Sequence, residues 1–291
     1  MKIDVLSPYG YCAGVASAMD IAKKAAKDYK DNSIVVLGML VHNNDALKEL
    51  EYLGIKTIYH KDASLLDLID EIDKKSIVIL TAHGHSQEVE DKLNAKGIKF
   101  IDATCPFVKN SFKEIAQEIS NDHDVIYIGK KNHPESNAAL SLSKRVFLVE
   151  TDKKLDLSNI SDKSPLIISQ TTFSKYDVQE IVENIKKEIP GARILNGICN
   201  ASLKRQEALL NADPVSELIY VVGGANSNNT KTLFKMAQSH FKNARVLAIE
   251  NECDINKKDL LGLSHISIAS GASTPKEVID RIKSKIELLQ D

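Results

Sequence analysis

Three cysteines stand at comparable points of the sequence, each after a short apolar run and before a polar or helix-like segment. Cys105 follows the apolar run 98–101 and precedes Pro106, a residue that favours the first position of a helix. Cys12 and Cys199 follow similar runs, and the intervals between the three are nearly equal. A helix N-terminus lowers the pKa of a thiol and attracts anions. The spacing therefore suggests three similar lobes, each carrying one thiol at a strand end.

These thiols leave three chemical interpretations open. They are packed core cysteines, or one of them is a nucleophile activated by a histidine, or all three bind one metal centre. Zinc and iron–sulfur sites usually show clustered C-x-x-C ligands. No such cluster is present, so local spacing does not decide among the three. Cys253 lies out of phase with the series, and we expect a packing or surface role for it.

The elements that must position these thiols follow from the apolar pattern. Short β-rich runs alternate with longer amphipathic stretches, which is typical of βαβ units and parallel sheets. We expect strands at 2–6, 33–40, 76–80, 98–101, 125–128, 166–169, 192–195, 218–222, 246–249 and 266–269. We expect helices at 13–30, 44–53, 86–94, 107–119, 175–188, 230–240 and 275–289. The predicted fold class is therefore α/β.

Polar residues and histidines follow nearly every predicted strand. Ligands of open α/β sheets bind at the carboxyl ends of the strands. Helix capping explains any single Ser, Thr or Asn there, but not three histidines and three cysteines at the same edges. Gly-rich turns with such donors can hold a phosphate or diphosphate. The chain has no G-x-x-x-x-G-K-[ST] run and no G-x-G-x-x-G after the first strand, which argues against a P-loop and a nicotinamide dinucleotide site.

Composition narrows the class of protein further. The chain has 291 residues, is 43% hydrophobic and 27% charged, and has a formal net charge of -2. We therefore expect a soluble globular protein without a nucleic-acid partner. No apolar run approaches the length of a membrane span, and the sequence begins with a strand pattern rather than a signal peptide. Four widely spaced cysteines favour a reducing, cytoplasmic compartment.

Eight short motifs occur in an order that resembles one enzyme family, 4-hydroxy-3-methylbut-2-enyl diphosphate reductase, which catalyses the last step of the non-mevalonate isoprenoid pathway. The resemblance extends from Gly10 to about Pro275. The motifs are Gly10-Tyr11-Cys12-Ala13-Gly14-Val15, Val41-His42-Asn43, Ala82-His83-Gly84, Asp102-Ala103-Thr104-Cys105-Pro106, His133-Pro134-Glu135, Ser169-Gln170-Thr171-Thr172, Ile198-Cys199 and Gly271-Ala272-Ser273.

The resemblance implies three similar α/β lobes with parallel sheets, arranged as a trefoil around a central iron–sulfur cluster. The lobes would comprise residues 13–104, 105–198 and 199–291, the third joined by the N-terminal strand 1–12. Each lobe would supply one thiolate to a [4Fe-4S] cluster, namely Cys12, Cys105 and Cys199. One iron would lack a protein ligand and act as a Lewis acid.

The resemblance also assigns the remaining roles. Glu135 would deliver protons near the leaving hydroxyl group of an allylic diphosphate, and Thr171 would form hydrogen bonds to Glu135 and to that hydroxyl group. His133 would face the diphosphate and lie near the proton route. The other diphosphate-binding residues would be His42, His83, Ser227, Asn228, Asn229 and Ser273. With no flavin or nicotinamide motif, the electrons would come from a ferredoxin- or flavodoxin-type donor.

Two departures from the family pattern affect these expectations. The family has a second serine where this chain has Asn228, which still offers donors to a diphosphate. The family has Asp-Thr where this chain has Asn196-Gly197, which predicts a looser turn before Cys199. Two other classes of function stay open. They are a non-catalytic module that binds a phosphorylated metabolite, and a transferase with Cys105 as nucleophile.

Overall fold

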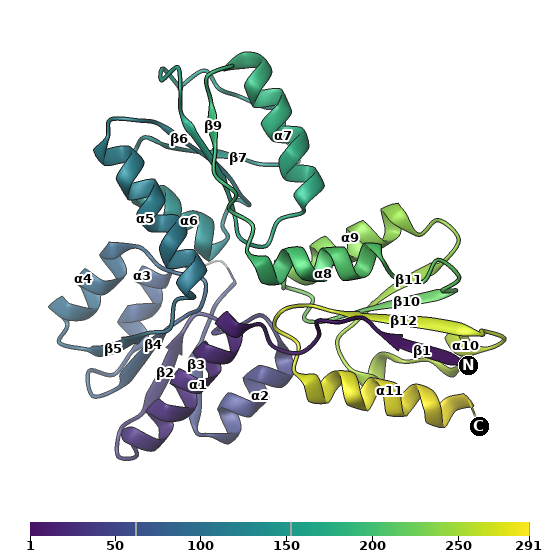
Figure 1. The fold of residues 1–291 in the computed structure, drawn as a ribbon. Coiled ribbons are helices and arrows are strands. Elements are labelled where there is room, and N and C mark those ends of the chain that lie inside the picture. Colours follow the sequence, from purple (N-terminus) through teal and green to yellow (C-terminus); the bar gives the residue numbers. More distant parts are fainter. Residues whose placement is uncertain (62, 152, 291) are drawn as a thin grey trace. The chain divides into compact units, whose positions relative to one another are not determined.

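Runs of Ile, Val and Leu form the central strands of three parallel sheets (Figure 1). Strands β2 (Ile34–Leu37), β4 (Ile77–Leu80), β6 (Val125–Ile128) and β8 (Leu166–Ser169) are buried along their whole length. Strands that helices cover on both faces read as continuous apolar runs rather than alternating ones. This is why the short apolar runs of the sequence were identifiable as strands.

The computed structural model describes residues 1–61, 63–151 and 153–290, which fall into two units. The first unit comprises Met1–Ala16, Val41–Glu49 and Asn200–Asp291, and the second comprises Ser17–Leu40 and Leu50–Cys199. Two of the four unit boundaries fall within helices α1 (Ala13–Asp28) and α2 (Asn44–Tyr52), and the other two fall at Leu40–Val41 and Cys199–Asn200. Asp291, the last residue of the predicted third lobe, lies outside the described residues.

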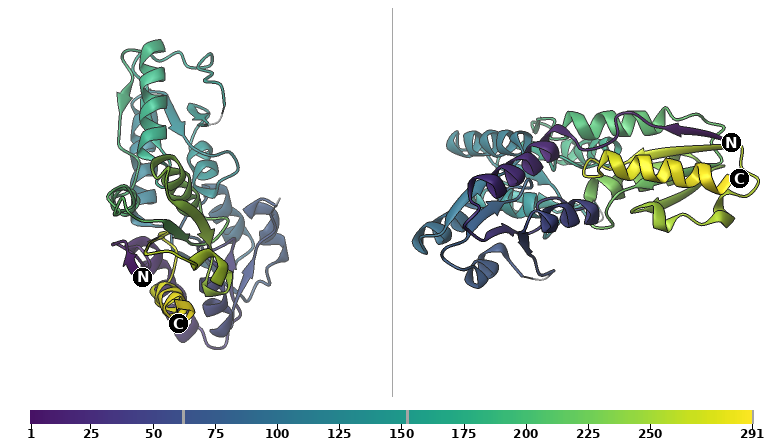
Figure 2. Two further views of the ribbon diagram at one scale, coloured as in Figure 1. Left: turned by 90° about the vertical axis from the view of Figure 1, so that its right-hand side faces the viewer. Right: turned by 90° about the horizontal axis from the view of Figure 1, so that it is seen from below.

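The first unit holds sheet A, in the order β1-β12-β10-β11. Its strands are β1 (Lys2–Val5), β10 (Leu218–Val222), β11 (Arg245–Ile249) and β12 (His265–Ser270). Helices α8 (Asn200–Leu210) and α9 (Asn228–His240) pack on one apolar cluster of this sheet. Helices α10 (Lys257–Leu260) and α11 (Lys276–Gln290) pack on the other, with the 3-10 turn η2 (Glu252–Asp254) beside them. The start of β1 and the end of α11 lie near each other in every view (Figure 2).

The second unit holds two sheets. Sheet B has the order β3-β2-β4-β5, with β3 (Ile55–Ile58) and β5 (Lys99–Asp102) at its edges. Sheet C has the order β7-β6-β8-β9, with β7 (Val146–Val149) and β9 (Arg193–Ile194) at its edges. The helical elements of this unit are α3 (Leu65–Leu68), η1 (Ile69–Glu71), α4 (Gln87–Ala95), α5 (Pro106–Ser120), α6 (Pro134–Ser141) and α7 (Lys175–Glu188).

The three sheets share one strand topology. In sheets B and C the chain forms an inner strand, then the edge strand beside it, then the second inner strand, then the far edge strand. Sheet A repeats this order with β10, β11 and β12, and β1 from the N-terminus takes the fourth place by pairing with β12. All strand pairs among the described residues are parallel, so the predicted α/β fold with parallel sheets is confirmed.

Several elements were not predicted from the sequence, among them the edge strands β3 and β7 and the helices α6 and α8, which carry or contact residues of the site. Helix α8 buries Ser202, Arg205 and Gln206 together with Leu209, so its inward face carries no regular apolar period. Helix α6 is short and follows a polar segment that is typical of a loop. The two strands are edge strands in which buried and less buried side chains are mixed: Ile55 in β3 and Val146 and Val149 in β7 are buried, and the remaining side chains are not.

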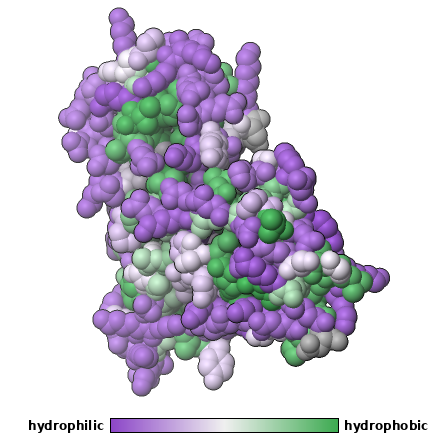
Figure 3. Space-filling model, turned by 45° about the vertical axis from the view of Figure 1, so that its right-hand side comes forward, coloured by the Kyte–Doolittle hydropathy of each residue, from purple (hydrophilic) through white to green (hydrophobic). Residues whose placement is uncertain are grey.

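Exposed apolar side chains are distributed over the surface rather than gathered in one described cluster. Tyr52, Leu261 and Leu288 are among the most exposed. The face drawn in Figure 3 is mostly hydrophilic, with hydrophobic side chains in separate areas. Scattered apolar residues of this kind are ordinary on protein surfaces. Within the described residues, none of the helices combines the length and the apolar composition that crossing a bilayer requires.

Candidate active site

The three cysteines of the sequence series occupy matching positions. Cys105 is the N-cap of α5, and Cys12 and Cys199 directly precede α1 and α8. Each thiol-bearing residue is half-buried. A helix N-terminus stabilises a thiolate, because the unpaired N–H groups of the first turn carry partial positive charge. All three side chains therefore lie at the N-terminus of a helix.

One backbone hydrogen bond recurs at the three cysteines. The N–H of Cys105 donates to the carbonyl oxygen of Ala82 at 3.0 Å, and that of Cys199 donates to Thr171 at 3.1 Å. In the first unit, the N–H of Cys12 donates to Ala272 at 2.9 Å. Each acceptor lies at the same distance in sequence from the end of the second inner strand of its sheet. The sheets thus hold the three thiols by the same device, which the even spacing of the cysteines had suggested.

The turn before Cys12 is fixed from within the first unit. Gly10 has a φ of 82°, a left-handed conformation that glycine adopts without strain. Its carbonyl oxygen accepts a 2.6 Å hydrogen bond from Nη2 of Arg205, which is buried on α8. A charge-assisted bond to a buried carbonyl holds this turn firmly. Sequence analysis had not identified Arg205, because it lies in the helix that was not predicted.

The turn before Cys199 is tighter than its departure from the family pattern predicted. A Cβ atom on Gly197 would lie 2.1 Å from the carbonyl oxygen of Ser169, so only glycine fits against the end of β8. The side-chain oxygen of Asn196 accepts a 3.2 Å hydrogen bond from the N–H of Ile198. Asn196-Gly197 therefore closes this turn by close backbone approach and an Asx-type bond.

Glu135 and Thr171 form a buried pair in the second unit. Glu135 lies in the first turn of α6 and is 1% exposed, and Thr171 follows β8. The backbone N–H of Thr171 donates to Oε1 of Glu135 at 2.8 Å, and its hydroxyl lies 2.9 Å from Oε2. Burial raises the pKa of Glu135 to about 7, although the hydrogen bonds from Thr171 and Tyr127 oppose this rise. The carboxyl group can therefore hold a proton near neutral pH and release it.

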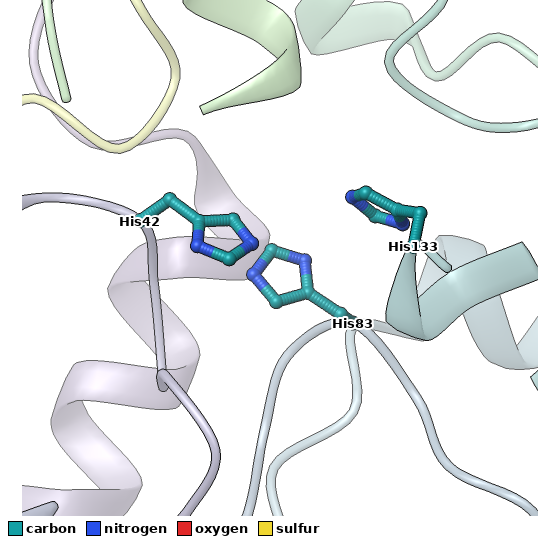
Figure 4. Close-up of side chains that lie close together, drawn as sticks. All are labelled: His42, His83 and His133. Atoms are coloured by element: carbon teal, nitrogen blue, oxygen red, sulfur yellow. The ribbon is translucent and has the colours of Figure 1, made fainter. Parts of the chain in front are cut away.

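His133 and His83 meet in the same unit (Figure 4). His133 caps the N-terminus of α6, where its Nδ1 accepts a 3.2 Å hydrogen bond from the N–H of Glu135. In the neutral ring this leaves the proton on Nε2, which is then a donor. The ring of His83, from the loop after β4, lies edge-on at a centroid distance of 5.7 Å. His42, also drawn in Figure 4, belongs to the first unit.

His42 is held neutral by its surroundings in the first unit. Burial lowers its pKa to about 4, and the positive charge of Lys231 lowers it further in the same direction. The carbonyl oxygen of His42 accepts a 3.3 Å hydrogen bond from the hydroxyl of Ser273. A Cβ on Gly224 would lie 2.3 Å from that carbonyl oxygen, so glycine at this position leaves room for the backbone of His42. The histidine is thus packed beside the loops that follow β10 and β12.

The N-terminus of α9 gathers the predicted diphosphate donors. Ser227 is the N-cap, with its hydroxyl accepting from the N–H of Thr230 at 3.3 Å, and Asn228 begins the helix. Asn229 is 3% exposed and both ends of its amide contact protein. Its Nδ2 donates to Ser202 at 3.2 Å, and its Oδ1 accepts from the N–H of Ala272 at 2.8 Å. Asn229 therefore links α8, α9 and the loop after β12.

Two residues next to these sites were missed by sequence reasoning. Lys231 lies in the first turn of α9, where a cation is unfavourable with respect to the helix dipole. In the sequence, Lys231 resembles any exposed helical lysine. The hydroxyl of Tyr127 lies 3.3 Å from Oε1 of Glu135. Nothing in its sequence context distinguishes Tyr127 from other residues of a buried strand.

The structure divides the predicted residues between its two units. Glu135, Thr171, His83 and His133 share the second unit with Cys105 and Cys199, and His42, Ser227, Asn228, Asn229 and Ser273 share the first unit with Cys12. The fold and the sites define an α/β protein with three parallel sheets, each leading a thiol to a helix N-terminus. The model of the LytB protein family matches residues 3–287. The chain belongs to this family.

Named relatives agree with this assignment. The chain is 39% identical to a 4-hydroxy-3-methylbut-2-enyl diphosphate reductase of Malacoplasma penetrans (strain HF-2), over 94% of this chain and 93% of the relative. It is 38% identical to the enzyme of that name from Bacillus cereus (strain AH820), over 99% of this chain and 90% of the relative. Their names describe an oxidoreductase.

Two solved structures share the fold. One is the E-1-hydroxy-2-methyl-but-2-enyl-4-diphosphate reductase from Plasmodium falciparum, with a TM-score of 0.87 and 27% identity over 100% of this chain and 88% of that chain. The other is described as (E)-4-hydroxy-3-methyl-but-2-enyl diphosphate reductase, the terminal enzyme of the non-mevalonate pathway. Its TM-score is 0.70 at 27% identity, over 99% of this chain and 100% of that chain.

Proposed function

We propose that the protein reduces (E)-4-hydroxy-3-methylbut-2-enyl diphosphate to isopentenyl and dimethylallyl diphosphate, the last step of the non-mevalonate pathway. Membership of the LytB family and the names of the relatives support this substrate. The single observation that carries the proposal is the buried Glu135–Thr171 pair, a proton source with its relay hydroxyl already in hydrogen-bond contact. Two electrons and two protons convert the allylic alcohol group of the substrate into a C–H bond and water.

Cys12, Cys105 and Cys199 are the proposed ligands of a [4Fe-4S] cluster. Iron–sulfur clusters bind cysteine thiolates, and the three residues share the same half-buried placement at the N-terminus of a helix. When bound, the cluster supplies electrons and one Lewis-acidic iron that lacks a protein ligand. The recurring backbone hydrogen bond at the three residues supports an equivalent role for each of them.

Glu135 is the proposed catalytic acid. Its neutral form carries a proton at a pH where ordinary carboxyl groups are ionised, because burial raises its pKa to about 7. The proton leaves an oxygen of Glu135 and passes through the hydroxyl of Thr171 to the departing hydroxyl group of the substrate. His133 binds the diphosphate and lies near this route, since its ring contacts the N–H of Glu135.

The diphosphate is proposed to bind His42, His83 and His133, the hydroxyl groups of Ser227 and Ser273, and the amides of Asn228 and Asn229. A helix N-terminus with hydroxyl and amide donors is a common phosphate-binding arrangement. Asn229 would act mainly by holding Ala272, and hence the loop with Ser273, against α9. Lys231 adds a positive charge beside His42.

The domain organisation and the partners follow from the same proposal. The lobes would be residues 13–104, 105–198 and 199–291 with the strand 1–12, each containing the four strands of one sheet. Electrons would come from a ferredoxin- or flavodoxin-type protein, because the reaction consumes two electrons and the sequence has no flavin or nicotinamide motif. We place the protein in the cytoplasm, where the thiols stay reduced.

Iron and acid-labile sulfide content, with the visible absorption spectrum of anaerobically purified protein, tests this proposal. We expect about four irons and four sulfides per chain. Substitution of Cys12, Cys105 or Cys199 by Ser should lower the iron content and bleach the spectrum. Cys253→Ser is the matched control and should change neither, because Cys253 is exposed and lies elsewhere. A colourless, iron-free wild-type protein that still binds diphosphate would instead support the metabolite-binding module.

A further inference from the structure

The two oxygens of the Glu135 carboxyl group have different neighbours. Oε1 receives the backbone N–H of Thr171 at 2.8 Å and the hydroxyl of Tyr127 at 3.3 Å. Oε2 has the hydroxyl of Thr171 at 2.9 Å. Tyr127 comes from β6, and the proposed proton transfer from Glu135 to Thr171 does not itself use it.

These contacts determine which oxygen can carry the proton. A backbone N–H can only donate, so Oε1 must accept from Thr171 in every protonation state. The hydroxyl of Tyr127, which also interacts with the hydroxyl of Ser136, lies at a second position on the same oxygen, and as a donor to Glu135 it favours Oε1 as the carbonyl-type acceptor of a neutral carboxyl group. The proton then belongs on Oε2, where it donates to Oγ of Thr171. That donation turns the hydrogen of Thr171 away from Glu135 and toward another acceptor.

We infer that Tyr127 is a positioning residue that, with the N–H of Thr171, keeps the proton of Glu135 on Oε2 and so directs the acid through Thr171. The direction of the relay toward a substrate hydroxyl rests on the proposed function. The proton balance is simple. The Oε2–H bond breaks as Oγ of Thr171 gains that proton and passes its own proton on. The carboxylate that remains is stabilised by the two donors on Oε1.

The side chain of Tyr127 is closely packed, and Gly129 leaves the space that its ring occupies. The side chain is 0% exposed and packs in the apolar cluster of β6, α5 and α6. A Cβ on Gly129 would lie 2.6 Å from the ring of Tyr127 and 2.6 Å from the hydroxyl of Ser136. Glycine at this position therefore leaves the space that the tyrosine ring and the first turn of α6 require.

Removing the Tyr127 hydroxyl should raise the pKa of Glu135, because the ionised form loses a donor in a buried place. The titratable side chains in contact with the Glu135 segment are Tyr127 from β6 and His133 from the start of α6. Thr171, from the loop after β8, does not titrate in this range. The pKa of Tyr127 itself is raised well above its ordinary value by burial, so it stays a neutral donor throughout.

The test is an infrared titration of the full-length, anaerobically purified protein, following the C=O stretch of the protonated Glu135 carboxyl group. Glu135→Gln identifies the band by its loss. We expect Tyr127→Phe to move the midpoint upward by about one pH unit. A fluorotyrosine incorporated at position 127, which is a stronger donor, should move the midpoint downward. This second variant keeps the side-chain shape, so it answers the question even where Tyr127→Phe folds poorly.

Tyr220→Phe is the matched control. Tyr220 is also 0% exposed and is the third residue of its strand, but its hydroxyl has no hydrogen-bond partner among the described residues. It should leave the midpoint unchanged. An unchanged midpoint in the position-127 variants, or an equal shift in Tyr220→Phe, would overturn the inference. The titration does not depend on turnover. If the band shifts as expected in a protein that lacks reductase activity, the result would contradict the proposed function but not the role of Tyr127.

With activity present, the same variants give a second readout. The basic limb of the kcat profile should follow the infrared midpoint to higher pH in Tyr127→Phe, while KM for the diphosphate substrate changes less than about twofold. A loss of kcat at every pH without a shift of the limb would indicate a merely structural role for Tyr127.

Discussion

Glu135, which is buried, and His42, which is half-buried, have pKa values that move in opposite directions. Burial raises the pKa of Glu135 to about 7 and lowers that of His42 to about 4. Each shift favours the neutral form, since taking a charge out of water is costly. The two groups differ in the side chains that surround them. Glu135 is surrounded by hydrogen-bond donors, which reduce the rise in its pKa. His42 lies near the cation Lys231, which lowers its pKa further.

This difference separates two uses of the same physical effect. A carboxyl group with donors around it can both keep a proton and tolerate its loss, which suits an acid that is used in each turnover. A neutral histidine next to the positive charge of Lys231 lies in a region of positive potential. Under the proposed function, a diphosphate would bring negative charge to this region and make protonation of His42 favourable. Under the proposed function, Glu135 would serve proton delivery and His42 would serve anion binding.

The largest expected effect comes from Glu135→Gln. The variant keeps the shape and the contact with Thr171 but has no acidic proton. Turnover should fall by about 10²- to 10⁴-fold, the usual contribution of a general acid. Iron content and diphosphate affinity should be unchanged, as measured by metal analysis and calorimetry. Wild-type turnover in this variant would remove Glu135 from the mechanism.

The stability of the protein should also depend on Glu135. Its folded-state pKa lies above the ordinary value of 4.5, so its contribution is fully present below pH 4.5 and is lost as pH rises to about 7. The loss is about 3 kcal/mol of unfolding free energy. Denaturant unfolding of wild type and Glu135→Gln across this range measures it. The two curves should diverge with rising pH, and parallel curves would contradict the buried, shifted carboxyl group.

The contribution of His42 to the stability of the protein should depend on pH in the opposite direction. Its folded-state pKa lies below 6.5, so its contribution is present above pH 6.5 and is lost as pH falls to about 4. We expect a loss of about 2 kcal/mol, reduced because the ring is only half-buried. His42→Asn should flatten this part of the stability profile. A flat profile in the wild-type protein would show that His42 is already solvated or paired.

Lys231→Gln should give the smallest effect. Losing one charge near a bound diphosphate should weaken diphosphate binding by about tenfold. The NMR titration of His42 should shift upward only in part, since burial is the main cause of its low pKa. Lys235, one turn further along α9, provides the comparison, and Lys235→Gln should bind diphosphate more nearly as wild type does. Equal weakening in both variants would indicate a general charge effect.

The parts of this account that sequence could predict are those with a local signal. Buried Ile-Val-Leu runs identified the central strands, and the even spacing of Cys12, Cys105 and Cys199 anticipated three sheets of one topology. The ordered motifs then pointed to Glu135 and Thr171, which the structure places in direct contact.

The remaining features depend on contacts between residues distant in sequence. Helix α8 packs through Arg205 and Gln206 rather than through an apolar stripe, so no periodic pattern reveals it. Tyr127 resembles any strand aromatic until the carboxyl group of Glu135 is seen beside its hydroxyl. The departure at Gly197 predicted a loose turn, because nothing local shows that the backbone of Ser169 requires that space.

The most direct test of the central claim is anaerobic turnover of (E)-4-hydroxy-3-methylbut-2-enyl diphosphate by the iron-loaded protein with a reduced one-electron donor. The account predicts that isopentenyl and dimethylallyl diphosphate form from the allylic substrate, and that Glu135→Gln with the same iron content forms almost none. Iron-loaded wild-type protein that binds the substrate and forms neither product would contradict it.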